Sequence, residues 1–270
     1  MQPSDASNVE IRPMGVDLVT NVCLHHGPLA ACTLTPSTDE KVDARLLTHP
    51  WPDSLIDELA PQLGQHLFCP PGRSVERREF LREVTLRYGA CAIQAWDGDL
   101  IVGVVRFFPS GLLLRLGQQS PDLQSSWFWP AVEADDPANT LFVLCVETGA
   151  ANFQPGILVA PPDEPTAGDP LAYQRRGIGS LLVRALIDWA REHGWARLQV
   201  GAGQDLEIVY GLTGTGGRTF WEKLGFRTER ELPVLPWVAG DLPVLSYQAS
   251  RRRMDLDDAQ RQWLMVLDLE

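Results

Sequence analysis

The sequence predicts an α/β fold in which strands and helices alternate around one mixed sheet. Three observations predict this class. Residues 141–146 are a continuous apolar run, which is typical of a central strand covered on both faces. Residues 178–189 repeat apolar side chains at helical spacing, which indicates a long amphipathic helix. From residue 40 onward, strand and helix patterns follow one another in turn.

The composition restricts the possible partners. The chain has 270 residues, of which 44% are hydrophobic, so it is long enough for one large domain or an ordinary one with additions. Lysine and arginine number 23 against 35 aspartate and glutamate, which gives a formal net charge of −12. This balance argues against nucleic acid as a partner, because such a surface needs clustered positive charge. It fits solubility alone or a cationic small-molecule partner.

The sequence also contains features that bear on the cellular compartment of the protein. Residues 1–10 lack a basic region followed by an apolar run, so we expect no secretory signal. The longest apolar stretch, residues 100–108, is too short to span a membrane and contains Arg106. Five scattered cysteines without a CxxC pair indicate reduced thiols. We therefore expect a cytoplasmic protein with no membrane partner.

Before the central strand, turn-rich residues 1–39 precede a more regular pattern. Asp97-Gly98 between two apolar runs is the strongest hairpin signal in the sequence. Helical spacing after Asp53 predicts a helix that Pro61 should break or kink. The elements expected here are strands at 16–24 and 42–47, helices from Asp53 and from Ser74 to Gly89, and hairpin strands at 91–96 and 100–107.

Around the central strand and the long helix, the pattern predicts short elements separated by long loops. Gly194 should end the helix that begins at Ile178. Leu-Pro-Val-Leu occurs at 232–235 and again at 242–245, and we interpret the pair as a local hairpin or loop. The loops are expected at 109–140, 149–173, 203–217 and 233–258, a short helix at 219–224, and strands at 196–200, from Phe226 and at 263–269.

One segment carries a chemical signal. Residues 174–180 read Gln-Arg-Arg-Gly-Ile-Gly-Ser and open the amphipathic helix. The first turn of a helix has N–H groups without intrahelical partners and the positive end of the helix dipole, so it suits a phosphate or pyrophosphate. Gly177 and Gly179 allow an anion close to the backbone, and Arg175 and Arg176 add positive charge. The alternative is an ordinary helix start with solvated arginines.

At this point the sequence resembles the GNAT N-acetyltransferase superfamily, whose phosphate motif reads Gln/Arg-x-x-Gly-x-Gly/Ala. Residues 174–179 match every specified position. Residues 220–226, Phe-Trp-Glu-Lys-Leu-Gly-Phe, are similar to the family's late helix-to-strand segment, and residues 265–269 to its last strand. The resemblance covers residues 40–270. It implies a central splayed β-sheet with helices on both faces.

The resemblance also implies acetyl-CoA, or another acyl-CoA, bound in the splay beside the central strand. The main chain at Cys145 and Val146 would pair with the pantetheine arm and polarise the thioester carbonyl. The reaction would be direct attack of an amine on the thioester, aided by a base and an acid. The cofactor residues implied are Cys145, Val146, Gln174, Arg175, Arg176, Gly177, Ile178, Gly179 and Ser180.

The sequence departs from the family at two positions. The family's general-acid tyrosine corresponds to Trp221, whose indole N–H is no practical proton donor. Tyr210, in the nearby glycine-rich stretch, is a substitute, and a proton from solvent is an equal alternative. An asparagine often found seven residues before that tyrosine is Gly214 here, which removes one expected cofactor contact.

Glu147 is the candidate general base, because it ends the central strand near the expected thioester. Strand alternation, however, places Thr140, Phe142, Leu144 and Val146 on one face and Glu147 on the other, unless a bulge re-aims it. A surface carboxylate is the other interpretation of Glu147. Further alternatives for the base lie in the preceding loop, at Glu133, Asp135 and Asp136.

Several other patterns do not support a function. Residues 212–219 lack the first glycine and the lysine of a P-loop, and Leu182 stands where a dinucleotide-binding motif needs its third glycine. Cys23, His25, His26 and Cys32 match no common zinc spacing, so we expect no metal. The aromatic residues 127–129 fit the core or a subunit interface better than a substrate cage.

Together these observations predict an N-terminal extension over residues 1–39 and an acetyltransferase domain over 40–270 with long loop insertions, of which 149–173 is a candidate lid or interface. We expect an acyl-CoA-dependent N-acyltransferase that acts on a small amine, and the net charge favours a cationic one. The sequence is also compatible with a homodimer. The alternative is a CoA-binding sensor or assembly module without transfer activity. Trp221 and the missing asparagine motivate it.

Overall fold

The computed structural model describes residues 9–17, 19, 29–30, 43–66, 75–126, 128–148, 173, 175–234 and 241–270. Most of the strand predicted at 16–24, the loop residues 149–172, and Ser74, Gln174 and Trp127 lie outside these ranges, as do Cys23, His25, His26, Cys32 and Cys69. The strands are β1 (Glu10–Pro13), β2 (Leu29–Ala30), β3 (Ala92–Asp97), β4 (Leu100–Pro109), β5 (Thr140–Thr148), β6 (Arg197–Gly203), β7 (Arg227–Leu232) and β8 (Gln262–Asp268).

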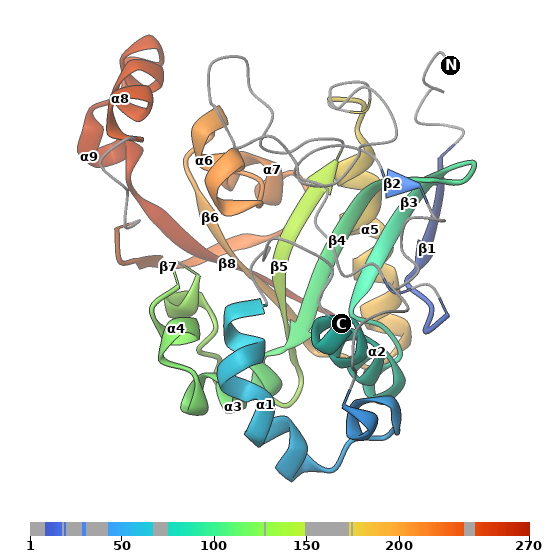
Figure 1. Cartoon of the computed structure of the whole chain (residues 1–270). Coiled ribbons are helices and arrows are strands. Elements are labelled where there is room, and N and C mark those ends of the chain that lie inside the picture. The colour runs from blue at the N-terminus through green and yellow to red at the C-terminus, as the bar shows by residue number, and fades with distance from the viewer. Residues whose placement is uncertain are drawn as a thin grey trace.

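The strands form one mixed sheet in the order β1-β3-β4-β5-β6-β8-β7, with β2 also paired to β4. Among the strands described, β5 and β6 are parallel and the other pairs are antiparallel. The register between β5 and β6 extends only from Thr140↔Arg197 to Phe142↔Gln199. Beyond Phe142 the two strands separate, so the sheet is splayed at its centre (Figure 1). The predicted mixed, splayed sheet is confirmed.

Helices cover both faces of the sheet (Figure 1). They are η4 (Ala44–Leu47), α1 (Asp53–His66), α2 (Val75–Tyr88), α3 (Ser110–Gln119), α4 (Pro121–Gln124), η5 (Trp129–Ala131), α5 (Ile178–Glu192), α6 (Glu207–Thr213), α7 (Arg218–Glu222), α8 (Leu242–Arg251) and α9 (Leu256–Ala259). One core cluster joins α1, α2 and α3 to one face, and a second joins α5 and α7 to the other. This two-layer burial explains why β4 and β5 are apolar almost throughout.

The best-supported predictions are confirmed. Asp97 pairs with Leu100 across the hairpin, and Gly98, the first residue of its two-residue turn, has a φ of 59°, which favours glycine. Gly89 and Gly194, with φ of 89° and 74°, follow the ends of α2 and α5 as expected. Both glycines adopt a left-handed backbone that other residues rarely adopt.

Several expectations are wrong. The loop expected at 203–217 contains helix α6. Residues 44–47 form a 3₁₀ helix where a strand was expected, with Asp43 accepting from the Arg45 N–H as its cap. Helix α1 continues through Pro61 to His66, so the proline does not break it. The expected loop at 109–140 contains α3, α4 and η5, because Leu112, Leu113 and Leu116 bury one helical face. The loop at 233–258 contains α8 and α9, and α8 starts at the second Leu-Pro-Val-Leu, with Pro243 in its first turn.

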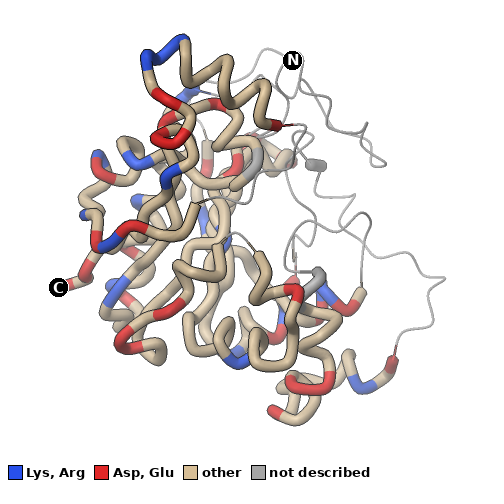
Figure 2. Tube along the Cα trace, turned by 90° about the vertical axis from the view of Figure 1, so that its left-hand side faces the viewer, with Lys and Arg blue, Asp and Glu red and all other residues tan. Residues whose placement is uncertain are grey.

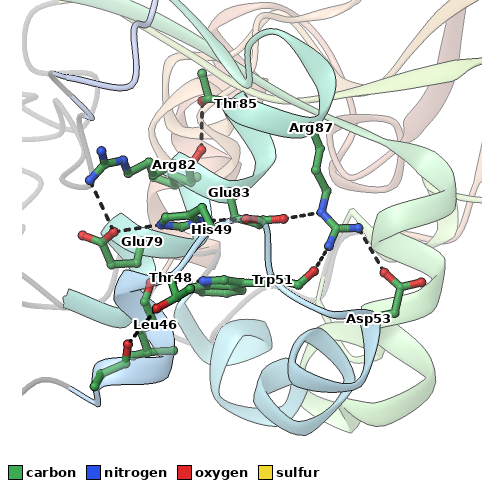
Figure 3. Close-up of polar contacts among 12 residues, drawn as sticks. Leu46, Thr48, His49, Trp51, Asp53, Glu79, Arg82, Glu83, Thr85 and Arg87 are labelled. Carbon is green, nitrogen blue, oxygen red and sulfur yellow. Dashed lines mark hydrogen bonds and ion pairs between the residues drawn. The ribbon is translucent and has the colours of Figure 1, made fainter.

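A network of charged side chains joins the segment before α1 to α2 (Figure 3). His49 lies between two carboxylates one helical turn apart, with Nδ1 2.7 Å from Glu83 Oε2 and Nε2 3.2 Å from Glu79 Oε2. Arg87 donates to Glu83, to the Trp51 carbonyl and, at 3.0 Å, to Asp53. The side chains of Glu79 and Glu83 are only 1% exposed, so the network is buried at its centre. It fixes residues 49–53 onto α2.

Two strands come from the predicted N-terminal extension. β1 pairs with β3 over four residues, and β2 pairs with the start of β4. Residues of the extension thus lie in the same sheet as the rest of the described chain. Within the described residues, no helix is long and apolar enough to cross a membrane.

Candidate cofactor site

A cavity of about 340 Å³ opens where β5 and β6 separate. The end of β5 lines one side and the start of α5 another, and the segment from α6 to α7 completes it. The lining residues are Val146, Thr148, Arg175, Gly177, Ile178, Gly179, Ser180, Tyr210, Thr215, Gly216 and Phe220. Seven of these belong to or adjoin the predicted phosphate motif or central strand, and the structure brings those two segments together.

The backbone before α5 is shaped for this cavity. Arg175 and Gly177 both have left-handed φ values, of 59° and 82°, and the helix begins at Ile178. The first intrahelical hydrogen bond runs from Leu181 N to Gly177 O, so the N–H groups of residues 178–180 precede it. These N–H groups and the helix dipole make the cavity wall attractive to an anion.

Glycine has a different role at each of the two glycine positions of the motif. A Cβ at Gly177 would meet nothing within 4 Å, so only the φ of 82° favours glycine there. A Cβ at Gly179 would lie 3.7 Å from Val146 Cγ1 and 3.8 Å from the Phe220 ring, which is ordinary contact. Glycine at 179 therefore keeps the cavity open rather than relieving strain.

A β-bulge reverses the predicted faces at the end of β5. Arg106 pairs with Cys145 but Phe107 pairs with Val143, so Leu144 is the extra residue in the ladder. Val146 consequently packs with the α5-side cluster that contains Val143, and not with Phe142 and Leu144 as expected. The alternation after the bulge turns Glu147 to the side of Phe142 and Leu144.

Glu147 is fully buried at 0% exposure, so it is not a surface carboxylate. A Cβ at Gly214 would lie 3.7 Å from its Oε1 atom, which places the carboxylate beside the turn after α6. The main-chain N–H of the preceding residue, Val146, donates to the Gly214 carbonyl at 2.6 Å. Gly214 therefore contacts the strand on which both the predicted base and the predicted thioester contact lie.

Tyr210 lines the cavity, but its proton is directed elsewhere. Its hydroxyl donates to Asp205 Oδ1 at 3.0 Å, and a Cβ at Gly217 would come within 2.4 Å of that oxygen. Glycine at 217 is therefore what lets Asp205 and Tyr210 meet. Burial, together with the Asp205 charge, raises the pKa of Tyr210 well above its usual range. Such a hydroxyl is a weak acid, with its hydrogen bond already made.

Trp221, at the position of the family's tyrosine, is fully buried at 0% exposure in the α5-side core. Its indole N–H donates to the Gly216 carbonyl at 2.9 Å. The side chain thus holds the Gly216 turn in place, and its neighbour Phe220 contributes to the cavity instead.

The remaining predicted residues are spread around the site. Cys145 is buried beside Gly214 without lining the cavity, and Arg176 is not among its lining residues. Arg175 lines the cavity and pairs with Glu207 of α6. Gln174 lies outside the described residues.

The alternative carboxylates at residues 133–136 lie at the other end of β5. The Thr140 hydroxyl at the start of β5 donates to the Asp136 carbonyl at 2.7 Å. Thr140 is six residues from Val146, about 20 Å along an extended strand. Glu133 is 76% exposed and 3.9 Å from Arg230. These carboxylates are too far away to act at the cavity.

Sequence reasoning missed Thr148, Thr215, Gly216 and Phe220 as lining residues. Phe220 stands inside the quoted 220–226 segment, and Thr215 and Gly216 belong to the glycine-rich stretch whose P-loop interpretation fails. The glycines indicated a tight backbone path, and the structure shows that this path borders the cavity. Among the described residues, no group of three or more His, Cys, Asp or Glu side chains converges as metal ligands do.

Part of this site lies in a segment that is similar to a known protein family. Residues 171–226 match the model of the Acetyltransferase (GNAT) family. The matched segment contains all of α5, β6, α6 and α7, and therefore most of the cavity lining. The resemblance to GNAT acetyltransferases is confirmed for this segment. A search of curated protein sequences found no match to the chain.

Solved structures give distant similarities. An N-acetyltransferase from Staphylococcus aureus is 12% identical over 97% of this chain and 99% of its own, with a TM-score of 0.43. A GNAT-family acetyltransferase from Streptococcus pneumoniae is 11% identical over 97% and 99%, with a TM-score of 0.42. A Bacillus subtilis acetyltransferase in complex with CoA is 15% identical over 70% and 84%, with a TM-score of 0.34. Similarities this low carry no argument about substrate or mechanism.

Proposed function

We propose that this protein is an acyl-CoA-dependent N-acyltransferase that transfers an acetyl group to a primary amine. One observation carries the proposal. The cavity at the splay has the start of α5 as one wall and the end of β5 as another, and most of its lining falls in the segment that matches the GNAT family. The net charge of −12 favours a small cationic amine as the acceptor.

The chain offers binding groups for the pyrophosphate, the pantetheine arm and the thioester of an acyl-CoA. The N–H groups at the start of α5, from Gly177 to Ser180, would hold the pyrophosphate, assisted by Arg175. The Val146 N–H would pair with the pantetheine arm in the manner of an added strand. Bound acyl-CoA supplies an activated thioester. Its carbonyl would be polarised by a separate main-chain N–H group near the end of β5.

Glu147 is proposed as the general base, because the bulge at Leu144 turns this buried carboxylate away from the α5 face. A base removes the proton that makes an ammonium unreactive. Glu147→Gln should lower kcat by about 100-fold, within the range for loss of a general base, and leave the Kd for CoA unchanged. Stopped-flow or steady-state rates with calorimetry measure both. A kcat within twofold of wild type would remove Glu147 from the mechanism.

For the acid, Tyr210 and a solvent proton remain the two candidates. The hydrogen bond to Asp205 favours the solvent proton, since Tyr210 has only one hydrogen to donate. If Tyr210 is the acid, Tyr210→Phe should lower turnover most at alkaline pH. Unchanged rates across the pH profile would assign the step to solvent.

The decisive experiment follows thiol release from acetyl-CoA across a panel of amines. Wild type should release thiol only when an accepted amine is present. Gly177→Glu is the control, because it places a carboxylate at the φ-strained start of α5 and should abolish CoA binding. Absence of CoA binding by the wild type would overturn the proposal.

A second candidate is a CoA-binding sensor or assembly module without transfer activity. The observation that favours it is that the two side chains considered for the acid already donate their hydrogens within the protein. The Trp221 indole N–H donates to the Gly216 carbonyl, and the Tyr210 hydroxyl donates to Asp205. Calorimetric CoA binding without amine-stimulated thiol release under any condition would support this candidate over the enzyme.

A further inference from the structure

Helix α6 lies at the splay, and its two ends contact groups that the proposed cofactor site needs. At its C-terminal end, the Gly214 carbonyl accepts the Val146 N–H at 2.6 Å. Gly214 lies against β5, since a Cβ there would be 3.3 Å from Cys145 Cβ. A backbone residue has one N–H to donate. A ligand that pairs with Val146 must therefore replace the Gly214 carbonyl.

At the N-terminal end of α6, Glu207 forms an ion pair with Arg175. Arg175 lines the cavity from a left-handed backbone, beside the start of α5. The two side chains are 84% and 50% exposed, and pairs this exposed contribute little to stability. A ligand phosphate competes directly with Glu207 for this guanidinium, because both are anions with the same hydrogen-bonding geometry.

The support for α6 comes from α8 and α9 rather than from either main core. The Ile208 N–H donates to Gln248 Oε1 of α8 at 3.0 Å. Buried side chains of the three helices form a separate cluster, which consists of Leu206, Ile208, Val209, Leu245, Ala249 and Ala259. A shift of α6 together with α8 would leave both main core clusters intact. Tyr210 on α6 also lines the cavity, so such a shift changes its shape.

We propose that α6 is an internal competitor of the cofactor and moves out of the splay when acyl-CoA binds. In the closed arrangement of this structure, the Gly214 carbonyl and the Glu207 carboxylate occupy the two donors that the ligand needs. In the bound arrangement, both donors face the ligand and α6 is released. This proposal rests on the proposed function, because the ligand in question is an acyl-CoA.

A reversible cross-link tests it. Gly214→Cys places a thiol beside Cys145 with a Cβ separation near 3.3 Å, slightly below the usual disulfide range, so a small shift allows the bond. Oxidation should fix α6 to β5. The oxidised variant should bind CoA about tenfold more weakly, or worse, than the same protein after reduction, by calorimetry. The Gly214→Cys/Cys145→Ser double variant and oxidised wild type should show no such redox effect.

Equal affinity in the oxidised and reduced variant, with the disulfide verified by mass, would overturn the proposal. Hydrogen–deuterium exchange of the unmodified protein decides the matter even if the disulfide does not form. With CoA, residues 207–213 should exchange faster while residues 178–182 exchange more slowly. Unchanged or slower exchange at 207–213 beside slower exchange at 178–182 contradicts the movement of α6. Wild type that binds no CoA would instead overturn the proposed function.

Discussion

At the scale of single residues, Gly177 and Gly179 offer a test that separates backbone strain from loss of room in the cavity. Gly177→Ala forces a Cβ into a φ of 82° and should lower the free energy of unfolding by about 1–2 kcal/mol. Gly179→Ala lies inside α5, where alanine is the better helix former, and should leave stability unchanged or slightly higher. Urea unfolding measures both. Equal losses in the two variants would contradict the different roles assigned to them.

The same pair predicts different effects on the ligand. The Gly179→Ala methyl group would enter the cavity beside Val146 and Phe220, so CoA should bind more weakly although the fold is intact. Calorimetry with the stable Gly179→Ala variant measures this directly. An unchanged Kd would mean that the cavity wall at residue 179 does not touch the ligand.

Glu83 is the residue on which the buried network depends. Burial favours its neutral form, but hydrogen bonds from Arg87 and His49 outweigh burial and lower the pKa of Glu83. Glu83→Gln removes the charge and leaves Arg87 without its buried partner, which should cost about 3 kcal/mol of stability.

Glu58→Gln is the matched control, because Glu58 also pairs with an arginine but is 54% exposed. That change should cost no more than about 1 kcal/mol. Chemical unfolding compares the two variants. Similar losses would show that burial adds nothing to the Glu83 network.

At the scale of elements, the sequence predicted the parts that local patterns determine. The hairpin, α5 and the central strand follow from Asp97-Gly98, from the apolar repeat and from the run at 141–146. Helix α3 was missed although Leu112, Leu113 and Leu116 have helical spacing. The start of α8 was likewise predicted as a loop. It contains Pro243, and proline is well tolerated in the first turn of a helix.

The site was predictable where it depends on neighbouring residues and not where it depends on pairing. Residues 175–180 border the cavity with their own backbone, and the glycines among them predicted this from the sequence. The face of Val146 depends on the bulge at Leu144, which is set by the register with β4 and has no signature in β5 alone. The contacts of Gly214 and Glu207 with the site join segments far apart in the chain, so no local pattern contains them.

Helix α6 yields a prediction that uses its ion pair. Glu207→Gln removes the competitor of a ligand phosphate at Arg175 and should tighten CoA binding by about two- to fivefold, the range expected for an exposed pair. Glu222→Gln removes the same charge from an exposed pair with Arg218 rather than with Arg175. Calorimetry at one ionic strength compares them. An equal gain in CoA affinity in both variants would mean that the change in net charge alone causes the effect.

At the scale of the whole molecule, charge is distributed rather than segregated. Figure 2 shows basic and acidic residues interspersed over the face it presents. Many of them pair across elements, as Arg197 does with Asp268 at 2.7 Å and Arg115 does with Asp57 at 2.7 Å. The excess of acidic residues therefore coexists with an extensive set of ion pairs that hold neighbouring elements together.

These pairs predict how stability depends on pH. A hydrogen bond from Arg227 lowers the pKa of Asp268, and one from Arg115 lowers the pKa of Asp57. The pKa of Glu83 is also lowered, as described above. The unfolded chain therefore takes up protons at a higher pH than the folded chain. Stability from these groups is complete above about pH 5 and is lost as the pH falls through the lower folded values.

Thermal unfolding between about pH 3 and pH 7 tests this expectation. The midpoint should stay level above about pH 5 and fall steadily below it. Glu83→Gln should flatten that fall more than Asp268→Asn, because the Glu83 side chain is 1% exposed and that of Asp268 is 47% exposed, where water screens the ion pair. A fall of the same steepness in Glu83→Gln and wild type would show that acid sensitivity arises from surface carboxylates rather than from the buried network.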